Sequence, residues 1–123
     1  MKKKALVVDD NQNNQLLEKD LLELGGFEVL EAGNAADAIA IALKEIPDII
    51  IMDVRLPDMR GTEAARLLRE VKETCSIPIV FVTASIAGGF EEMNTISNSG
   101  LITKPINTRT FADEIIQFLF RGL

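Results

Sequence analysis

Four short apolar runs in this sequence each lead into side chains that could bind a cation or a phosphoryl group. Asp9 and Asp10 follow one run, and Asp53 follows another. Thr83 lies at the end of a third run, and Lys104 comes after a fourth. Apolar runs bounded by turn residues are typical of strands covered on both faces. Open α/β sheets bind ligands just outside the carboxyl ends of such strands, so these five residues are candidates for one site.

The residue types at these positions predict the chemistry of that site. Three clustered aspartates would raise one another's pKa, and a hard divalent cation with oxygen ligands would compensate for their charge. Mg²⁺ suits such ligands, and Mn²⁺ accepts the same oxygen donors. The Thr83 hydroxyl and the Lys104 ammonium would then bind phosphoryl oxygens and stabilise charge in the transition state. The pattern therefore predicts phosphoryl transfer onto Asp53.

The elements that must position these groups alternate between strand and helix five times. Strands are expected at Lys4–Val8, Phe27–Ala32, Ile49–Asp53, Ile79–Val82 and Leu101–Thr103. Helices are expected from Asn11 to about Leu24, from Asn34 to just before Pro47, from Gly61 through Val71, near Phe90–Asn98, and from Thr108 onward. Crossovers long enough for a helix each imply an α/β fold, with a parallel sheet and helices on both faces.

Two of these helices carry finer expectations. In the first, Leu17, Leu21 and Leu24 are predicted to form the buried stripe. The fourth is predicted to be the weakest in the chain, because its segment is rich in Gly, Asn, Ser and Thr.

Composition and charge exclude several classes of function. The 123 residues fit one domain, 1–123. No apolar run approaches the ~18 residues that cross a bilayer, and the apolar part of the basic N-terminus is too short for a signal peptide, so a cytoplasmic protein without membrane contact is expected. A net charge of −6 disfavours direct binding to nucleic acid. With no histidine and only Cys75, acid and metal chemistry must come from carboxylates.

In the order and spacing of its motifs, the sequence resembles the receiver domain of two-component response regulators across essentially its whole length. The motifs that carry the resemblance are Asp9-Asp10, Asp53, Pro57, Gly61, Thr83-Ala84 and Lys104-Pro105. The resemblance implies a flavodoxin-like, doubly wound (βα)5 fold with strand order 2-1-3-4-5.

The resemblance also implies a role for each acidic residue. Asp53 would attack the phosphorus of a phosphohistidine, carried by a histidine kinase or a histidine phosphotransfer protein, and become an aspartyl phosphate. Asp10 and Asp53 would ligate Mg²⁺ directly. Asp9 would bind the ion through water, and the backbone carbonyl of Arg55 would be a further ligand.

The remaining motif residues would surround the phosphoryl group. Lys104 would pair with it, Thr83 would move toward it, and Ala84 would keep its approach open. The peptide bond before Pro105 is expected to be cis. The loop beside the phosphoacceptor is expected to be shaped by its turn formers, Pro57 and Gly61.

The sequence departs from the family pattern in the predicted fifth strand. Most members carry an aromatic switch residue three positions before the lysine, and this chain has Leu101 there. The usual coupling between the threonine and an aromatic ring is therefore in question. Arg55 and Ser85 flank the site, where they could alter how fast water removes the phosphoryl group.

The function predicted from these residues is a phosphoacceptor switch or relay protein without an output domain, which signals by contacts with a downstream protein. The alternative form is a receiver excised from a hybrid histidine kinase or from a regulator with an output domain. Such a protein promotes its own phosphorylation and dephosphorylation without turning over an independent substrate.

Two other classes of function are weighed against this one. A phosphatase with an aspartate nucleophile wants a second acid two residues after that nucleophile, where this chain has Arg55. A flavodoxin-like mononucleotide binder would need small hydroxyl residues after the first strand, where Asp9 and Asp10 would repel a phosphate.

Overall fold

The computed structural model describes residues 2–84 and 95–121. Its strands are β1 (Lys4–Val8), β2 (Glu28–Ala32), β3 (Ile49–Asp53), β4 (Ile79–Thr83) and β5 (Ser99–Thr103). Its helices are α1 (Gln12–Leu24), α2 (Ala35–Glu45), α3 (Gly61–Arg69) and α5 (Phe111–Arg121). The strands form one parallel sheet in the order β2-β1-β3-β4-β5, so the predicted class and strand order are confirmed.

Local signals in the sequence set the ends of the first two helices. The side chain of Asn11 accepts a hydrogen bond from the backbone N–H of Asn14 at 3.0 Å, and Asn34 caps α2 in the same way through Asp37 at 2.8 Å. These caps satisfy amide groups that a helix N-terminus leaves without partners. At its other end α2 stops at Ile46, which adopts a left-handed conformation.

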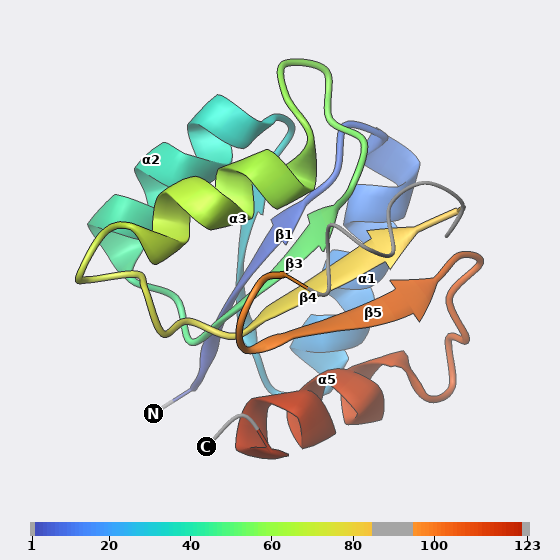
Figure 1. Ribbon diagram of the computed structural model, residues 1–123. Coiled ribbons are helices and arrows are strands. Elements are labelled where there is room, and N and C mark those ends of the chain that lie inside the picture. The colour runs from blue at the N-terminus through green and yellow to red at the C-terminus, as the bar shows by residue number, and fades with distance from the viewer. Residues whose placement is uncertain (1, 85–94, 122–123) are drawn as a thin grey trace.

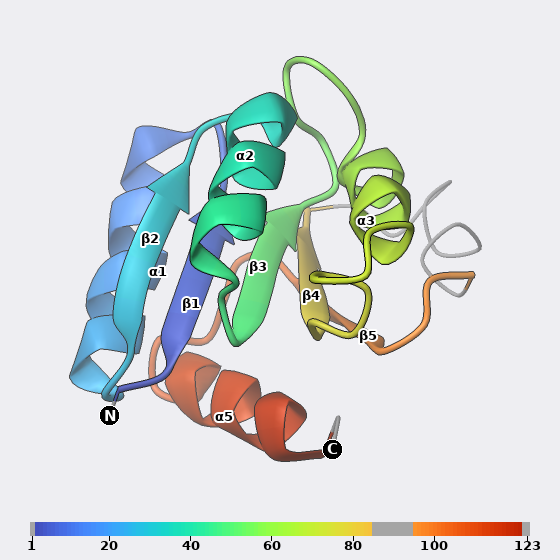
Figure 2. The ribbon, with the colours of Figure 1, turned by 90° about the vertical axis from the view of Figure 1, so that its left-hand side faces the viewer.

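The sheet is covered on both faces, by α2 and α3 on one side and by α1 and α5 on the other (Figures 1 and 2). Alternate residues of the central strands therefore enter two separate cores. On the α2 and α3 side the strands contribute Leu6, Val8, Ile50, Met52, Ile79 and Phe81. On the α1 and α5 side they contribute Ala5, Val7, Ile49, Ile51, Val80 and Val82.

The predicted buried stripe of α1 is wrong at two of its three positions, and only Leu21 packs, partly buried, against the core. Leu17 is 40% exposed and Leu24 is 86% exposed, whereas the fully buried side chains of this helix are Glu18 and Leu22. The five leucines of α1, at positions 16, 17, 21, 22 and 24, are spread around the helix, so more than one face could have been the apolar one. The sequence pattern alone therefore did not fix the rotation of the helix.

Some element bounds also differ from the prediction: β2 begins at Glu28 rather than Phe27, and α3 ends at Arg69 rather than Val71. β5 begins two residues earlier than predicted, at Ser99, and α5 begins at Phe111 rather than Thr108. The helix expected near Phe90–Asn98 falls mainly on residues outside the described part. Its last four positions, Thr95–Asn98, form a turn with bends instead.

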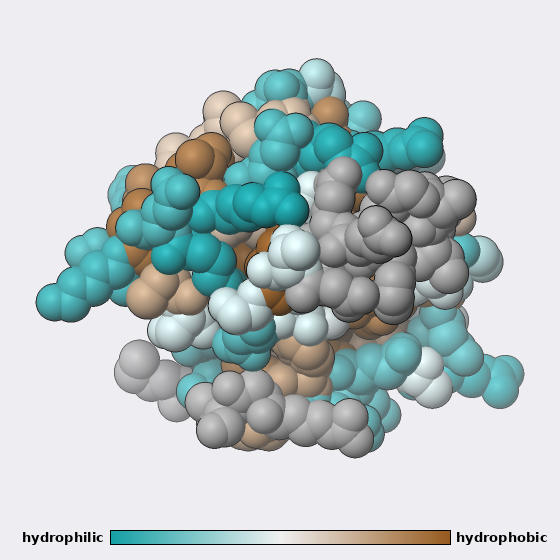
Figure 3. Space-filling view, in the orientation of Figure 1, coloured by the Kyte–Doolittle hydropathy of each residue, from teal (hydrophilic) through white to brown (hydrophobic). Residues whose placement is uncertain are grey.

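The surface drawn in Figure 3 is mostly hydrophilic, with hydrophobic side chains emerging on the side of α2 and α3. The partly exposed apolar residues of these two helices include Leu43 and Leu67. Across residues 2–84 and 95–121, no helix combines the length and the apolar character that crossing a bilayer requires.

Candidate functional site

The residues that the sequence predicted to form one site meet at one edge of the sheet, where the carboxyl ends of the parallel strands lie (Figure 1). Asp9 follows β1, Asp53 and Thr83 close β3 and β4, and Lys104 follows β5. Val8 pairs with Met52 and Met52 pairs with Phe81, so the ends of β1, β3 and β4 are in register. The topology alone thus brings together residues up to 95 positions apart.

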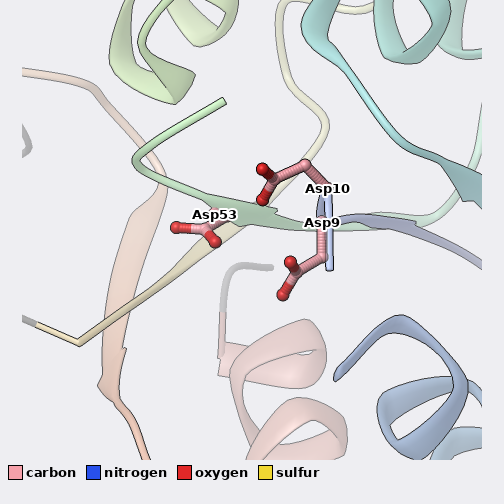
Figure 4. Close-up of side chains that lie close together, drawn as sticks. All are labelled: Asp9, Asp10 and Asp53. Carbon is pink, nitrogen blue, oxygen red and sulfur yellow. The ribbon is translucent and has the colours of Figure 1, made fainter. Parts of the chain in front are cut away.

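Asp9, Asp10 and Asp53 form the acidic cluster of this edge (Figure 4). One carboxylate oxygen from each lies within 4.8 Å of the others. Asp9 is buried, Asp53 is half-buried and Asp10 is exposed, so the cluster extends from the interior to the surface. Three hard oxygen donors at this separation suit a divalent cation such as Mg²⁺.

Lys104 places a positive charge between two of these carboxylates. Its Nζ donates to Asp9 Oδ2 and to Asp53 Oδ2, each at 3.0 Å. Burial alone would lower the pKa of Lys104, but the hydrogen bonds to Asp9 and Asp53 outweigh that effect and raise it. The lysine therefore stays protonated and offsets part of the repulsion within the acidic cluster.

Backbone amides hold the other oxygen of each of these two carboxylates. Asp9 Oδ1 accepts from the N–H of Asn11 at 2.9 Å, and Asp53 Oδ1 accepts from the N–H of Arg55 at 3.1 Å. Because each side chain is fixed at both oxygens, its rotamer is set before any ligand arrives. The side chain of Arg55 itself is exposed.

The loop from Val54 to Arg60 is held close to Asp53. The N–H of Gly61 donates to the carbonyl of Val54 at 2.8 Å. An isolated antiparallel β-bridge pairs the backbones of Arg55 and Arg60. A Cβ atom on Gly61 would overlap the backbone carbonyl of Asp53. Only glycine allows α3 to begin so near the phosphoacceptor candidate.

A second acid anchors the same loop to α2. Asp58 accepts from the N–H groups of Ala35 and Ala36, each at 2.9 Å. The hydrogen bond from Ala35, followed by that from Ala36, lowers the pKa of Asp58. The exposed Pro57 lies beside this anchor, in the turn that the sequence predicted.

The residues after β4 and β5 border the acidic cluster. Thr83 is buried, and its carbonyl accepts from the N–H of Lys104 at 2.8 Å. The exposed Ala84 lines a cavity of about 400 Å³ together with Lys104 and Pro105. The Lys104–Pro105 bond is cis, as expected. Ser85, named from the sequence as a flanking residue, lies outside the described part of the chain.

Leu101, at the position where an aromatic residue is usual in the family, is half-buried. It pairs with Phe81 across the sheet and packs against the core beneath α2 and α3. The side chain therefore acts as part of the core on the α3 side of β5.

Sequence reasoning missed Glu18. Its side chain is only 3% exposed, and it lines the cavity that also contains Lys104. Burial, followed by the charge of Asp9, raises its pKa to about 8. The sequence did contain a signal for this burial, because Glu18 lies one helical turn before the buried Leu22 and one turn after Gln15. The side chain of Gln15 faces the same edge and donates to the carbonyl of Asp9 at 3.1 Å.

Comparison with known proteins accounts for this arrangement. The family model of the response regulator receiver domain matches residues 5–116. The chain belongs to the response regulator receiver family. This receiver is thus a phosphoacceptor switch of the two-component type. Receivers bind Mg²⁺ at an acidic pocket and interact with histidine kinases or phosphotransfer proteins, and the acidic cluster here has the donors for such a pocket.

Individual relatives cover nearly the whole receiver. The polar-differentiation response regulator DivK of Brucella anthropi is 33% identical over 120 residues, 97% of this chain and 98% of DivK. The chemotaxis response regulator CheY4 of Vibrio cholerae has a TM-score of 0.89 at 28% identity, covering 96% of this chain and 99% of CheY4. The receiver domain of a signal transduction histidine kinase from Syntrophus aciditrophicus has a TM-score of 0.87 at 25% identity. The match covers 97% of this chain and 91% of that receiver domain.

Proposed function

We propose that Asp53 is the residue of this receiver that accepts the phosphoryl group. The observation that carries the proposal is its position in the acidic cluster beside Lys104 Nζ, which lies 3.0 Å from Asp53 Oδ2. An attacking carboxylate needs a cationic environment for the incoming phosphoryl oxygens, and this is the one aspartate of the cluster at the end of the central strand β3.

The donor set of the site fits Mg²⁺, or Mn²⁺ in its place. Asp10 and Asp53 would bind the ion directly, Asp9 would bind it through water, and the Arg55 carbonyl would complete the protein ligands. The bound ion would neutralise phosphoryl charge that the three carboxylates would otherwise repel.

The side chains around Asp53 divide the remaining work. Lys104 neutralises charge on the phosphoryl oxygens, the Thr83 hydroxyl donates to another of them, and Ala84 leaves room for the group to enter. In the transfer step a phosphorus–oxygen bond forms at the Asp53 carboxylate. The phosphorus–nitrogen bond of the phosphohistidine breaks, and its electron pair returns to the donor imidazole.

The protein partners follow from the same proposal. A histidine kinase or a histidine phosphotransfer protein supplies the phosphoryl group in the cytoplasm, and a downstream protein reads the phosphorylated state. The domain 1–123 signals by protein contacts, without direct binding to nucleic acid or membrane and without turnover of a separate substrate. The similarity to a histidine-kinase receiver domain supports, as the second form of the proposal, a receiver that works within a larger kinase.

The experiment is phosphorylation by a small phosphodonor, followed by intact-mass measurement. With Mg²⁺ the wild-type protein should gain the mass of one phosphoryl group, and a chelator should prevent the gain. Asp53→Asn should gain nothing, because its amide is not a nucleophile. An equal gain in mass in Asp53→Asn, or no gain in mass in the wild type, would refute the proposal.

A further inference from the structure

Gln15 joins three elements at the edge of the sheet that carries the acidic cluster. It lies on α1, and its Nε2 donates to the carbonyl of Asp9 at 3.1 Å and to the carbonyl of Ala32 at 2.9 Å. Those two carbonyls lie at the carboxyl ends of β1 and β2. A side-chain amide has two N–H donors, so both donors of Gln15 are used. This half-buried side chain has no part in the proposed transfer.

The Asp9 carbonyl that Gln15 binds belongs to the peptide unit between Asp9 and Asp10. A peptide unit is planar, so a hydrogen bond to its oxygen limits the rotation of the whole unit. On the other side of the same residue, the N–H of Asp9 donates to the carbonyl of Ala32 at 3.1 Å. The backbone is therefore held both before and after the Asp9 side chain, and these contacts decide the direction in which Asp10 leaves β1.

The three acids of the cluster differ in how their side chains are held. The carboxylates of Asp9 and Asp53 each accept one hydrogen bond from Lys104 and another from a backbone amide. Among the residues that the structure describes, none donates a hydrogen bond to the exposed side chain of Asp10. The approach of an Asp10 oxygen to within 4.8 Å of the other two therefore depends on its backbone (Figure 4). Gln15 holds that backbone at the preceding peptide unit.

We propose that Gln15 is a positioning residue of the metal site, holding the peptide unit between Asp9 and Asp10 in the arrangement that binds Mg²⁺. The inference rests on the proposed function, because it requires the acidic cluster to bind the ion. Partners that orient metal ligands commonly change metal affinity by about 10–100-fold when they are removed. Gln15 acts on the backbone of the ligands rather than on their carboxylates, so the expected loss lies at the lower end of that range.

The first test measures Mg²⁺ affinity by calorimetry in Gln15→Met, at a temperature where the variant is folded. Methionine keeps the length and the unbranched shape of glutamine but donates no hydrogen bond. The variant should bind Mg²⁺ about tenfold more weakly than the wild type. In the metal-free variant, the N–H of Asp9 should exchange with solvent about fivefold faster, because the loss of a hydrogen bond loosens this backbone.

The dependence of the phosphorylation rate on Mg²⁺ concentration separates positioning from a direct role in the transfer. Gln15→Met should need about tenfold more Mg²⁺ to reach half of its maximal rate. The maximal rate itself should stay within about twofold of the wild-type rate, because only binding of the ion has been weakened. The hydrogen bonds of Gln15 reach neither Asp53 nor Lys104, which is why saturating metal should restore the rate.

The matched control is Gln117→Met, which makes the same chemical change at an exposed position of α5 and should leave Mg²⁺ affinity unchanged. Wild-type affinity in Gln15→Met, even with a lowered unfolding temperature, would overturn the positioning role while leaving the metal site intact. A maximal rate that falls at saturating Mg²⁺ as much as the affinity falls would also overturn it. Failure of the wild type to bind Mg²⁺ would overturn the metal site and the inference together.

Discussion

At the residue scale, the site depends on one lysine ammonium group that two carboxylates share. Lys104 is only partly exposed and bridges Asp9 and Asp53. In this environment a charge pair is much less screened than at the surface, so removing one member leaves its partners uncompensated. In the proposed function the lysine would therefore have two effects: it would stabilise phosphoryl charge, and it would compete with a bound metal ion for the same carboxylates.

These two effects predict opposite results for Lys104→Ala. Phosphorylation by a small donor should slow about 100-fold, since a charged donor to the developing phosphoryl charge is lost. Mg²⁺ should bind at least as tightly as to the wild type, because a positive charge has been removed from the site. The rate of adduct formation measures the first effect, and calorimetric titration with Mg²⁺ measures the second.

The control is Lys44→Ala, at an exposed lysine in the last turn of α2, which should match the wild type in both measurements. Loss of Mg²⁺ binding in Lys104→Ala, or an unchanged phosphorylation rate, would contradict the role given to Lys104.

At the element scale, the β3–α3 loop is fixed by a glycine at one end and an acid in its middle. Gly61 lets the N-terminus of α3 approach the carbonyl of Asp53, and Asp58 binds the N-terminus of α2. The loop therefore links two helices to the strand that ends at Asp53.

Gly61→Ala should destabilise the fold by about 1–3 kcal/mol, because the new methyl group forces backbone apart in a packed region. Urea unfolding measures the change. Gly33→Ala is the matched control, since no heavy atom lies within 4 Å of the Cβ position there, and its stability should stay near that of the wild type. Equal effects of the two substitutions would refute the steric argument.

Asp58→Asn should destabilise the protein in a pH-dependent way. The N–H groups of Ala35 and Ala36 hold the folded-state pKa of Asp58 below its ordinary value of 3.8, so its contribution to stability is present above that value and is lost as pH falls through the lowered pKa. The variant should unfold at lower denaturant than the wild type at neutral pH. The two midpoints should converge once the pH falls below the lowered folded-state pKa of Asp58. A gap that persists in acid would show that charge on Asp58 is not the cause.

At the scale of the whole molecule, metal binding should stabilise the fold, because the unfolded chain does not bring the three aspartates together. A ligand at 100 times its dissociation constant adds about 2.7 kcal/mol to the free energy of unfolding. The thermal midpoint of the wild type should therefore rise with Mg²⁺, and that of Asp10→Asn should rise much less. Equal rises would place the ion elsewhere.

The whole-molecule scale also explains which features could be predicted from the sequence. Uniformly apolar runs such as Ile49–Met52 and capping residues such as Asn11 are local signals, and the structure confirms them. Parallel topology then implied that the strand ends meet. The burial of Glu18 and the anchoring of α2 by Asp58 depend on how helices rotate and dock, and residue spacing does not encode those contacts locally.

The proposed function requires that Asp53 becomes phosphorylated and that Asp9 and Asp10, which lie beside it, do not. Borohydride reduction of the phosphorylated protein, followed by peptide mass mapping, marks the residue that carried an acyl phosphate. A single marked residue, Asp53, is expected in the wild type. A mark on Asp9 or Asp10, or a phosphoryl group that resists reduction because it sits on a hydroxyl, would contradict it.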